Sequence, residues 1–220
     1  MPVAKTVTLY SFEELTTQAQ ENIISAYVQD LPGWWSDDVE ERIRNEAQAL
    51  GINNFDFAWS GFWSQGDGLS FTGQLDFKDW LFILTERLSS DQFKNLCGKT
   101  PQEIVQLQES NRVIWGSCTI ERVSHQYSHE NTTRVCRLDS TLGWDERRGF
   151  PSDHEVMLKF DENALSELNV WKNELCNRWY AELQNTYESI TERSSIVSDL
   201  SSRDTLFTSN GTVVDDVEIV

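Results

Sequence analysis

The sequence predicts an α+β protein in which an antiparallel sheet built from hairpins packs against several helices, including a long C-terminal helix. Apolar and polar residues alternate over residues 55–60 and 69–77, which is the period of half-buried strands. Apolar residues recur every three or four positions near the N-terminus and over residues 162–193, which is the period of amphipathic helices. We therefore expect one α+β domain over residues 1–212, followed by a flexible acidic tail over residues 213–220.

The N-terminal region predicts two helices. A capping-box pattern at Ser11–Glu14 begins the first, because the Ser and Glu side chains can satisfy each other's backbone donors. Its apolar spacing continues to about Asp30, and Pro32-Gly33 ends it. Ser36 is a suitable N-cap for the second helix, and Gly51 supplies its C-terminal stop.

Two strand pairs are expected further along the chain. The alternating runs 55–60 and 69–77 are joined by a short Gly-rich connection, which is typical of an antiparallel hairpin. A second pair is expected over residues 113–123 and 132–138, with a turn through residues 127–131.

Helical patterns occupy the remaining segments between and after the strands. One helix is expected over about residues 78–88, and a second capping box, Thr100–Glu103, starts another with proline at its first position. Residues 143–153 predict a loop and residues 155–160 a short strand.

The C-terminal third predicts the longest helix, over about residues 162–193. Its stripe of aromatic and aliphatic side chains is typical of a core face. The segment from Ser194 is rich in Ser and Asp, and Asn210-Gly211 predicts a small terminal hairpin.

Composition and charge exclude several classes of protein. The 220 residues are 39% hydrophobic, as in a folded domain, and 36 acidic residues against 18 Lys and Arg give a net charge of −18. Such a charge opposes direct nucleic-acid binding and is typical of a solvated surface or of an acidic face for a basic partner. No run approaches the roughly 20 apolar residues of a membrane helix, and residues 1–20 do not resemble a secretory signal. The cysteines lie far apart and without metal-ligand spacing, which predicts free thiols in a reducing cytoplasm: Cys97, Cys118, Cys136 and Cys176.

One segment departs from this acidic character. Residues 112–148 contain six arginines and five acidic residues, and the histidines of the chain lie in or just after this segment. An anionic ligand could be tolerated here, because the guanidinium group binds phosphate or carboxylate through two parallel hydrogen bonds. The alternative is that these arginines pair with acids on neighbouring strands.

The connection Ser60–Gly68 reads S-G-F-W-S-Q-G-D-G and exceeds what a simple turn requires. Aromatic faces can stack a planar base or sugar, an amide and an acid can read polar edges, and glycines allow close approach of backbone. The alternative is that Phe62 and Trp63 belong to the core while Gln65 and Asp67 bond their own loop. The expected ligand-binding residues come from this loop and the Arg/His-rich segment: Trp63, Ser64, Gln65, Asp67, Arg122, His125, His129, Glu130 and Arg134.

The same residues argue weakly for catalysis. Ser64, Asp67 and His129 could form a nucleophilic triad, but no nucleophile-elbow pattern connects them. His125 and His129 with Glu130 resemble a metal pair, yet no Cys or further His completes a ligand set. We therefore expect no catalytic residues, no metal and no cofactor. A phosphodiesterase-like enzyme using His129 and Glu130 is the least favoured reading.

Several motifs together resemble a known family. They are Tyr10–Leu15, Phe62–Gly68, Tyr127–Glu130 and Tyr187–Thr191, followed by Phe207 and Asn210-Gly211. This order is similar to that of small acidic proteins encoded by bacteriophages and mobile elements and often labelled as antitoxins of toxin–antitoxin systems. The resemblance implies a phage accessory protein in the host bacterial cytoplasm, acting without catalysis and commonly against host defence.

Two function hypotheses follow from these observations. The first is an anti-defence protein that binds and sequesters a small anionic ligand of the nucleotide immune-signal type. The second is an acidic inhibitor, either a nucleic-acid mimic or an antitoxin, that binds a basic host protein or toxin. Aromatic residues are enriched at buried interfaces, so a homodimer is compatible with either.

Overall fold

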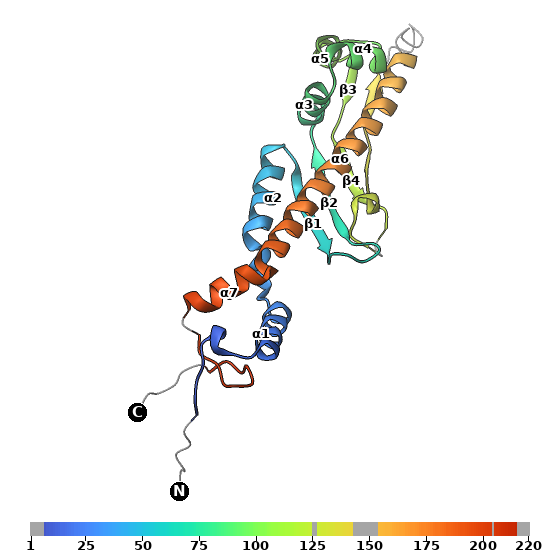
Figure 1. Ribbon diagram of the computed structural model, residues 1–220. Helices are drawn as coiled ribbons and strands as arrows, with labels where there is room; N and C mark the ends of the chain where they lie inside the picture. The colour runs from blue at the N-terminus through green and yellow to red at the C-terminus, as the bar shows by residue number, and fades with distance from the viewer. Residues whose placement is uncertain (1–6, 125–126, 143–153, 204, 215–220) are drawn as a thin grey trace. The chain divides into compact units, whose positions relative to one another are not determined.

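The computed structural model is α+β, as the sequence predicts (Figure 1). The chain divides into two compact units, called here the central unit, residues 40–182, and the terminal unit, residues 1–39 and 183–220. The single domain expected for residues 1–212 stays a prediction, because compactness alone does not decide whether two units unfold together. The structure describes residues 7–124, 127–142, 154–203 and 205–214. The expected loop 143–153 and residues 215–220 of the expected tail lie outside these ranges.

An antiparallel sheet of four strands lies in the middle of the central unit, in the order β1-β2-β4-β5. Its strands are β1 (Asn53–Ser60), β2 (Gly68–Leu75), β4 (Cys118–Arg122) and β5 (Thr133–Cys136). The predicted first hairpin is confirmed, since β1 and β2 pair from Asn53 opposite Gln74 to Ser60 opposite Gly68.

The second predicted strand pair is confirmed in part, since β4 and β5 are antiparallel with Glu121 opposite Arg134. The single strand expected over residues 113–123 was wrong, because this segment is divided into two strands. Residues Val113–Trp115 form β3, which pairs with β6 (Ser140–Leu142) in a separate two-stranded sheet. The break falls at Gly116, whose N–H donates to the Asp139 carbonyl at 2.7 Å and whose carbonyl accepts from Trp80 Nε1 at 3.1 Å. The buried positions change phase across this break, from Val113 and Trp115 before it to Cys118 and Ile120 after it, as expected where one strand ends and another begins.

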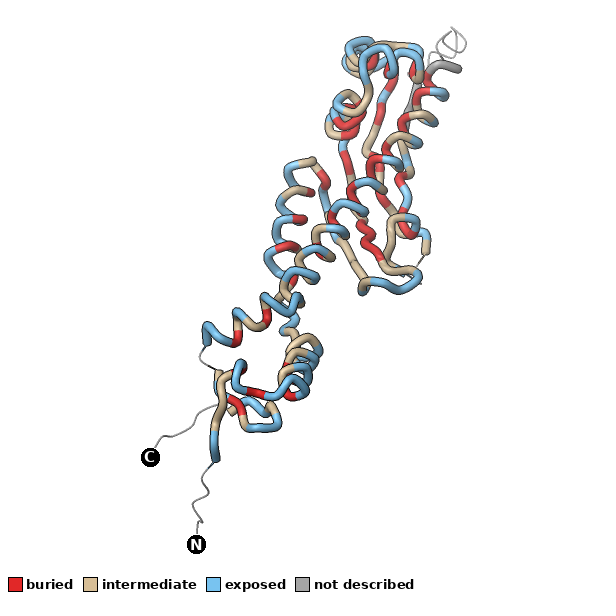
Figure 2. The backbone as a smooth tube through the Cα atoms, in the orientation of Figure 1, coloured by how far each residue is buried: buried red, intermediate tan, exposed pale blue. Residues whose placement is uncertain are grey.

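Helix α6 (His154–Thr191) covers one face of the four-stranded sheet with its aromatic stripe, as expected. The rings of Trp171 and Trp179 pack on Phe71 of β2 at centroid distances of 6.5 and 5.2 Å. In Figure 2 buried residues recur along α6 and along the strands that it covers. The short strand expected over residues 155–160 was wrong: this segment belongs to α6, and its buried Met157 and Phe160 continue the helical spacing.

Helix α2 (Asp37–Ala49) confirms the second predicted helix and packs beside α6 in the central unit. Its Ile43 and Ala47 are buried, and Glu46 accepts a hydrogen bond from Trp179 Nε1 at 2.8 Å. Gly51 adopts a φ of 76°, the left-handed conformation expected at a helix stop.

Three short helices complete the central unit. The predicted helices are confirmed as α3 (Phe77–Arg87) and α5 (Pro101–Glu109), the latter with the capping box at Thr100. Between them lies α4 (Ser90–Cys97), which was not predicted although Ser89 and Gln92 form a further capping box.

The terminal unit contains α1, α7 and the end of α6, and the structure departs from prediction at α1 and α7. Residues Phe12–Glu14 form a 3₁₀ turn, η1, and α1 (Thr17–Gln29) begins only after Thr16, whose hydroxyl accepts from the Ala19 N–H at 3.3 Å. The continuous helix expected from residue 12 was therefore wrong, because Thr16 is extended and caps a new helix. A second helix, α7 (Arg193–Ser202), follows where the Ser-rich composition favoured irregular structure.

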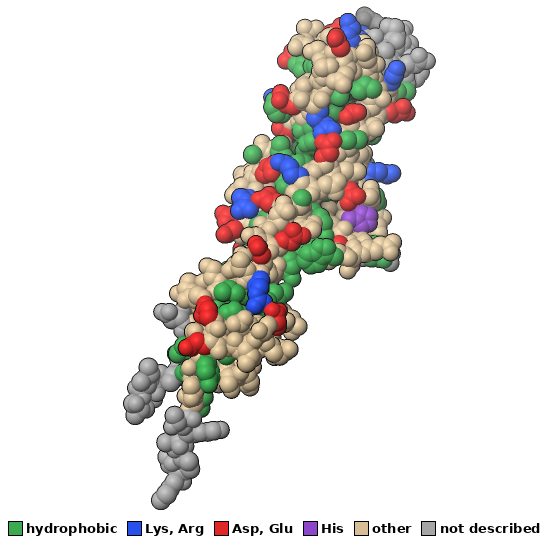
Figure 3. All heavy atoms as spheres, viewed as in Figure 1, with side chains coloured by type: hydrophobic (Ala, Val, Ile, Leu, Met, Phe, Trp, Pro, Cys, Tyr) green, Lys and Arg blue, Asp and Glu red, His purple; other side chains and the backbone are tan. Residues whose placement is uncertain are grey.

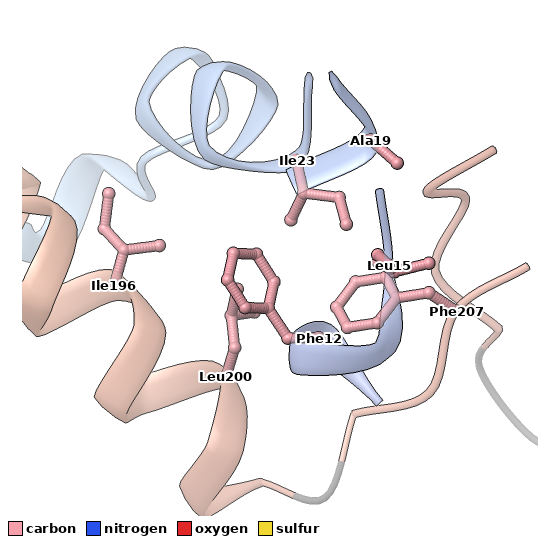
Figure 4. Packing of buried hydrophobic residues seen from close by; sticks show 7 residues of the cluster. All are labelled: Phe12, Leu15, Ala19, Ile23, Ile196, Leu200 and Phe207. Carbon is pink, nitrogen blue, oxygen red and sulfur yellow. The ribbon is translucent and has the colours of Figure 1, made fainter. Parts of the chain in front are cut away.

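A cluster of seven buried side chains forms the core of the terminal unit (Figure 4). Ile196 and Leu200 of α7 contribute to it, which explains why this Ser-rich segment becomes helical. Phe207 closes the cluster, and its backbone pairs with both Tyr10 and Val213. The predicted turn at Asn210-Gly211 is confirmed, with the Thr208 N–H donating to the Thr212 carbonyl at 3.0 Å.

A candidate binding site where two loops meet

The connection from β1 to β2, residues 60–68, is a closed turn that holds a tryptophan outward. The Ser64 N–H donates to the Asp67 carboxylate at 2.7 Å, and the Asp67 N–H donates back to the Ser64 carbonyl at 3.1 Å. Asp67 therefore bonds its own loop, as the turn alternative expected. Trp63 has a φ of 72° and is 69% exposed, and Gln65 beside it is also exposed.

Phe62 anchors this turn to the rest of the central unit. Its ring stacks on Trp59 at a centroid distance of 5.6 Å and packs at a tilt against Tyr180 of α6 at 5.5 Å. The Tyr180 hydroxyl also donates to the Gly61 carbonyl at 2.8 Å. Phe62 is thus structural, whereas the Trp63 side chain is exposed to solvent.

The connection from β4 to β5 packs directly against this turn. A Cβ atom added at Gly66 would lie 2.6 Å from Cδ1 of Tyr127, and one added at Gly68 would lie 2.6 Å from Cβ of His129. The absence of side chains at these two glycines therefore lets the loops touch. The structure thus brings together the two loops that the sequence proposed as halves of one site.

A buried lysine of α6 binds the connection from β4 to β5, called here the second loop. Lys172 of α6 is 1% exposed, and its Nζ donates to the carbonyls of Glu130 and Thr133 and to the Thr133 hydroxyl. Burial lowers the pKa of Lys172 below its ordinary value. Lys172 was not among the predicted site residues, although its spacing of four positions from Leu168 and from Cys176, both buried, was a signal of a core position.

The His129 and Glu130 side chains both interact with Asn131. His129 Nδ1 accepts a hydrogen bond from the Asn131 N–H at 3.2 Å, and the Glu130 carboxylate is 3.9 Å from the same nitrogen. Glu130 instead accepts from the Asn131 side chain at 2.8 Å. The half-buried imidazole is therefore oriented by the loop backbone.

The two arginines proposed for the site lie on opposite faces of the sheet. Arg134 is opposite Glu121 in register, whereas Arg122 is opposite Thr133. Because side chains alternate along a strand, Arg122 shares the covered face with Ile120, and Arg134 shares the other face with Gln74. Gly68 lies on that second face, being six residues before Gln74, so Arg134 rather than Arg122 is on the side where the loops meet. His125 lies outside the described residues.

Two buried hydroxyls lie on the same face of the sheet as Gly68. Ser60 pairs with Gly68 and Ser70 with Ala58, so both serines are on the face where the loops meet. Neither Oγ atom has a hydrogen-bond partner in the described part of the chain. Buried hydroxyls normally have a partner, so the lack of one at both serines is unusual.

The described residues offer little for nucleophilic or metal chemistry. Within residues 7–124, 127–142, 154–203 and 205–214 no group of three His, Cys, Asp or Glu side chains could hold a metal ion. Burial raises the pKa of the Cys97 thiol to about 11 and of the Cys118 and Cys176 thiols to about 12. Such thiols stay protonated and unreactive at neutral pH.

A separate groove runs between α3 and α5. Its volume is about 1070 Å³, and its apolar floor includes Leu81, Val105 and Phe82, which is 62% exposed. Three acidic residues and one lysine also line it: Asp76, Asp79, Glu109 and Lys78. On the face shown in Figure 3 acidic and basic side chains are otherwise interspersed.

One protein family matches this chain. The model of a domain of unknown function, DUF8835, matches residues 34–193, which include the entire central unit. The chain belongs to this family. Both loops and the α3–α5 groove fall inside the DUF8835 match, whereas most of the terminal unit falls outside it. No curated protein and no solved structure matches the chain. None of the helices in the described ranges has the length and apolar character needed to cross a bilayer.

Proposed function

We propose that this protein binds and sequesters a small anionic ligand of the nucleotide class where the two loops meet, without converting it chemically. In keeping with the resemblance to phage and mobile-element proteins, the ligand we propose is a bacterial immune signal, and the proposed role is anti-defence in the host cytoplasm. The observation that carries the proposal is the contact of the two loops at Gly66 and Gly68 beside an outward-facing tryptophan.

The conformation of Trp63 supports a binding role. A bulky residue at positive φ is rare, and such backbone strain costs about 1–3 kcal/mol. Strain of this kind persists when the surrounding structure imposes it, as the anchored Phe62 and the Ser64–Asp67 turn do here. The chain thus maintains an exposed indole in one defined position, which suits stacking on a planar base.

The other roles follow from the position of each residue. Gln65 is exposed next to Trp63 and would read the edge of the base. His129 and the exposed Arg134 are on the face where the loops meet and would bind the phosphate. We assign no contact to Arg122, because strand alternation places it on the covered face.

Differential scanning fluorimetry against a panel of cyclic and linear nucleotides tests this proposal, followed by calorimetry on any member that raises the melting temperature. Trp63→Ala should weaken binding by roughly 5- to 150-fold, since stacking contributes about 1–3 kcal/mol per base. Trp34→Ala is the matched control, because Trp34 is 67% exposed but belongs to the terminal unit. No shift with any nucleotide, or equal effects of the two substitutions, would refute the proposal.

The α3–α5 groove favours a second candidate function, an acidic inhibitor of a basic partner. An apolar floor with an acidic rim fits a basic amphipathic helix, whose apolar face would cover Phe82. This function predicts salt-sensitive binding to a basic protein that is lost in Phe82→Ser and retained in Trp63→Ala. The opposite pattern would exclude the groove.

A further inference from the structure

The terminal unit contains a partly open pocket that is independent of the loops and of the proposed function. Its volume is about 420 Å³, within the range of roughly 300–1,000 Å³ typical of small-molecule sites. Most of its lining is apolar and comes from α1, α7 and the end of α6, with Ile23, Ile190 and Leu200 among the side chains.

Three aromatic residues line the same pocket: Tyr27, Trp34 and Trp35. Two of them are fixed by their neighbours. The Tyr27 hydroxyl donates to Asp199 at 2.8 Å, and the Trp35 ring packs edge-on against Tyr187 at a centroid distance of 5.5 Å. Trp34 is 67% exposed and therefore lines the pocket at its solvent side.

The charges at this pocket leave one carboxylate uncompensated. Arg203 lines the pocket, but Asp199 binds its guanidinium group at 3.0 Å and neutralises it. Asp30 also lines the pocket, and its carboxylate forms no ion pair with any residue that the structure describes. The pocket thus combines aromatic faces with a net negative charge.

We propose that this pocket binds a small organic cation whose charge is surrounded by methyl or methylene groups, such as a quaternary ammonium compound. The negative faces of aromatic rings attract cations, and Trp is the strongest of them in this respect. For a metal ion or a bare ammonium, the hydration free energy lost on entering the apolar lining would exceed the interaction free energy gained there. An alkylated cation is weakly hydrated and itself apolar, so its loss of hydration free energy is smaller. Asp30 would provide the counter-charge at the pocket.

Choline and its neutral carbon isostere 3,3-dimethylbutan-1-ol test the proposal on the full chain. The two probes share shape and differ in charge, so titrations followed by tryptophan fluorescence and calorimetry separate cation recognition from simple apolar binding. Choline should bind roughly two- to thirtyfold more tightly than the alcohol, the ratio that a cation–π contact supplies. Equal affinity for the two probes, or no binding of choline, would overturn the proposal.

Substitutions locate the site. Trp34→Ala and Asp30→Asn should each weaken choline binding. Asp30→Asn should change the affinity for the alcohol less than the affinity for choline. Asp38→Asn is the control for charge, because Asp38 is exposed in the same unit and does not line the pocket. Trp63→Ala is the control for loss of an exposed indole. Circular dichroism confirms that each variant is folded, and Trp34→Phe, which keeps an aromatic face, should retain part of the affinity. Equal effects of Asp30→Asn and Asp38→Asn would place choline elsewhere.

Discussion

Gly68 occupies a position where no larger residue fits without moving backbone. A Cβ there would lie 2.6 Å from His129 Cβ and 2.9 Å from His129 Cα, so the second loop would have to withdraw. Gly61, in the same turn, would place a Cβ no closer than 3.8 Å to Asp67. The contact between the loops therefore depends on Gly68 much more than on Gly61.

Gly68→Ala should destabilise the central unit by about 1–3 kcal/mol, the usual effect of overpacking a close contact. Gly61→Ala should change the free energy of unfolding by much less, because its Cβ meets only an ordinary contact distance. Urea denaturation of both variants measures the difference. Similar values for the two would mean that the loops do not pack as described.

Lys172 shows how a single buried charge organises the second loop. Replacing it by methionine removes the donor to the Glu130 and Thr133 carbonyls and should cost about 1–3 kcal/mol or more at neutral pH, since buried acceptors are left without a partner.

The lowered pKa of Lys172 makes the free energy of unfolding depend on pH. The folded-state pKa of Lys172 is lowered from about 10.5, so the unfolded chain binds more protons in the window below 10.5. The free energy of unfolding of the wild type should therefore rise relative to that of Lys172→Met as the pH increases through this window. Urea titrations between neutral pH and pH 10 measure it, and a falling difference would contradict a lowered pKa.

At the scale of elements, α6 both covers the sheet and protects its edge. The outer backbone of β5 would be an unpaired edge, but Asn169 of α6 accepts from the Val135 N–H at 2.9 Å and donates to its carbonyl at 3.4 Å. One side chain thus replaces a neighbouring strand at this residue.

Asn169→Ala should expose this edge and cost about 1–3 kcal/mol, because two buried backbone groups lose their partner. In this variant the Val135 amide should also exchange with solvent faster than in the wild type, while the exchange of the β2 amides stays the same. Hydrogen–deuterium exchange measures both. Asn177→Ala on an exposed position of α6 is the control and should be nearly neutral. Unchanged exchange at Val135 would show that the helix does not protect the edge.

At the scale of the whole molecule, the two units differ in the size of their cores. The terminal unit is held by the cluster around Phe12 and Phe207, whereas the central unit buries a much larger aromatic core that includes Phe71, Trp80 and Trp179. Local stability follows buried apolar contacts, so the terminal unit should open first.

Phe207→Ala should cost about 3–5 kcal/mol in the terminal unit, as for other large core truncations. Hydrogen exchange should then show loss of protection in α1 and α7, while amides of β2 stay protected. Equal loss in both units would show that they unfold as one domain, as the sequence predicted for residues 1–212.

The periodicity of the sequence determined most elements by itself. The hairpin of β1 and β2, the helices α2, α3 and α5, and the long α6 follow from local spacing and capping, which act within a few residues. The turn at Ser64–Asp67 was likewise foreseen as one reading of the motif, since an acid can close its own loop.

Only the tertiary structure decided how these elements combine into a candidate site. The division of residues 113–123 between two sheets, the placement of Arg122 and Arg134 on opposite faces, and the support of a loop by Lys172 depend on partners far apart in the chain. Strand register sets faces, and a shift of one residue would exchange them, so spacing along one strand cannot assign a side chain to a site. The S-G-F-W-S-Q-G-D-G segment therefore predicted a loop of defined conformation, while only the tertiary structure showed its contact with the second loop.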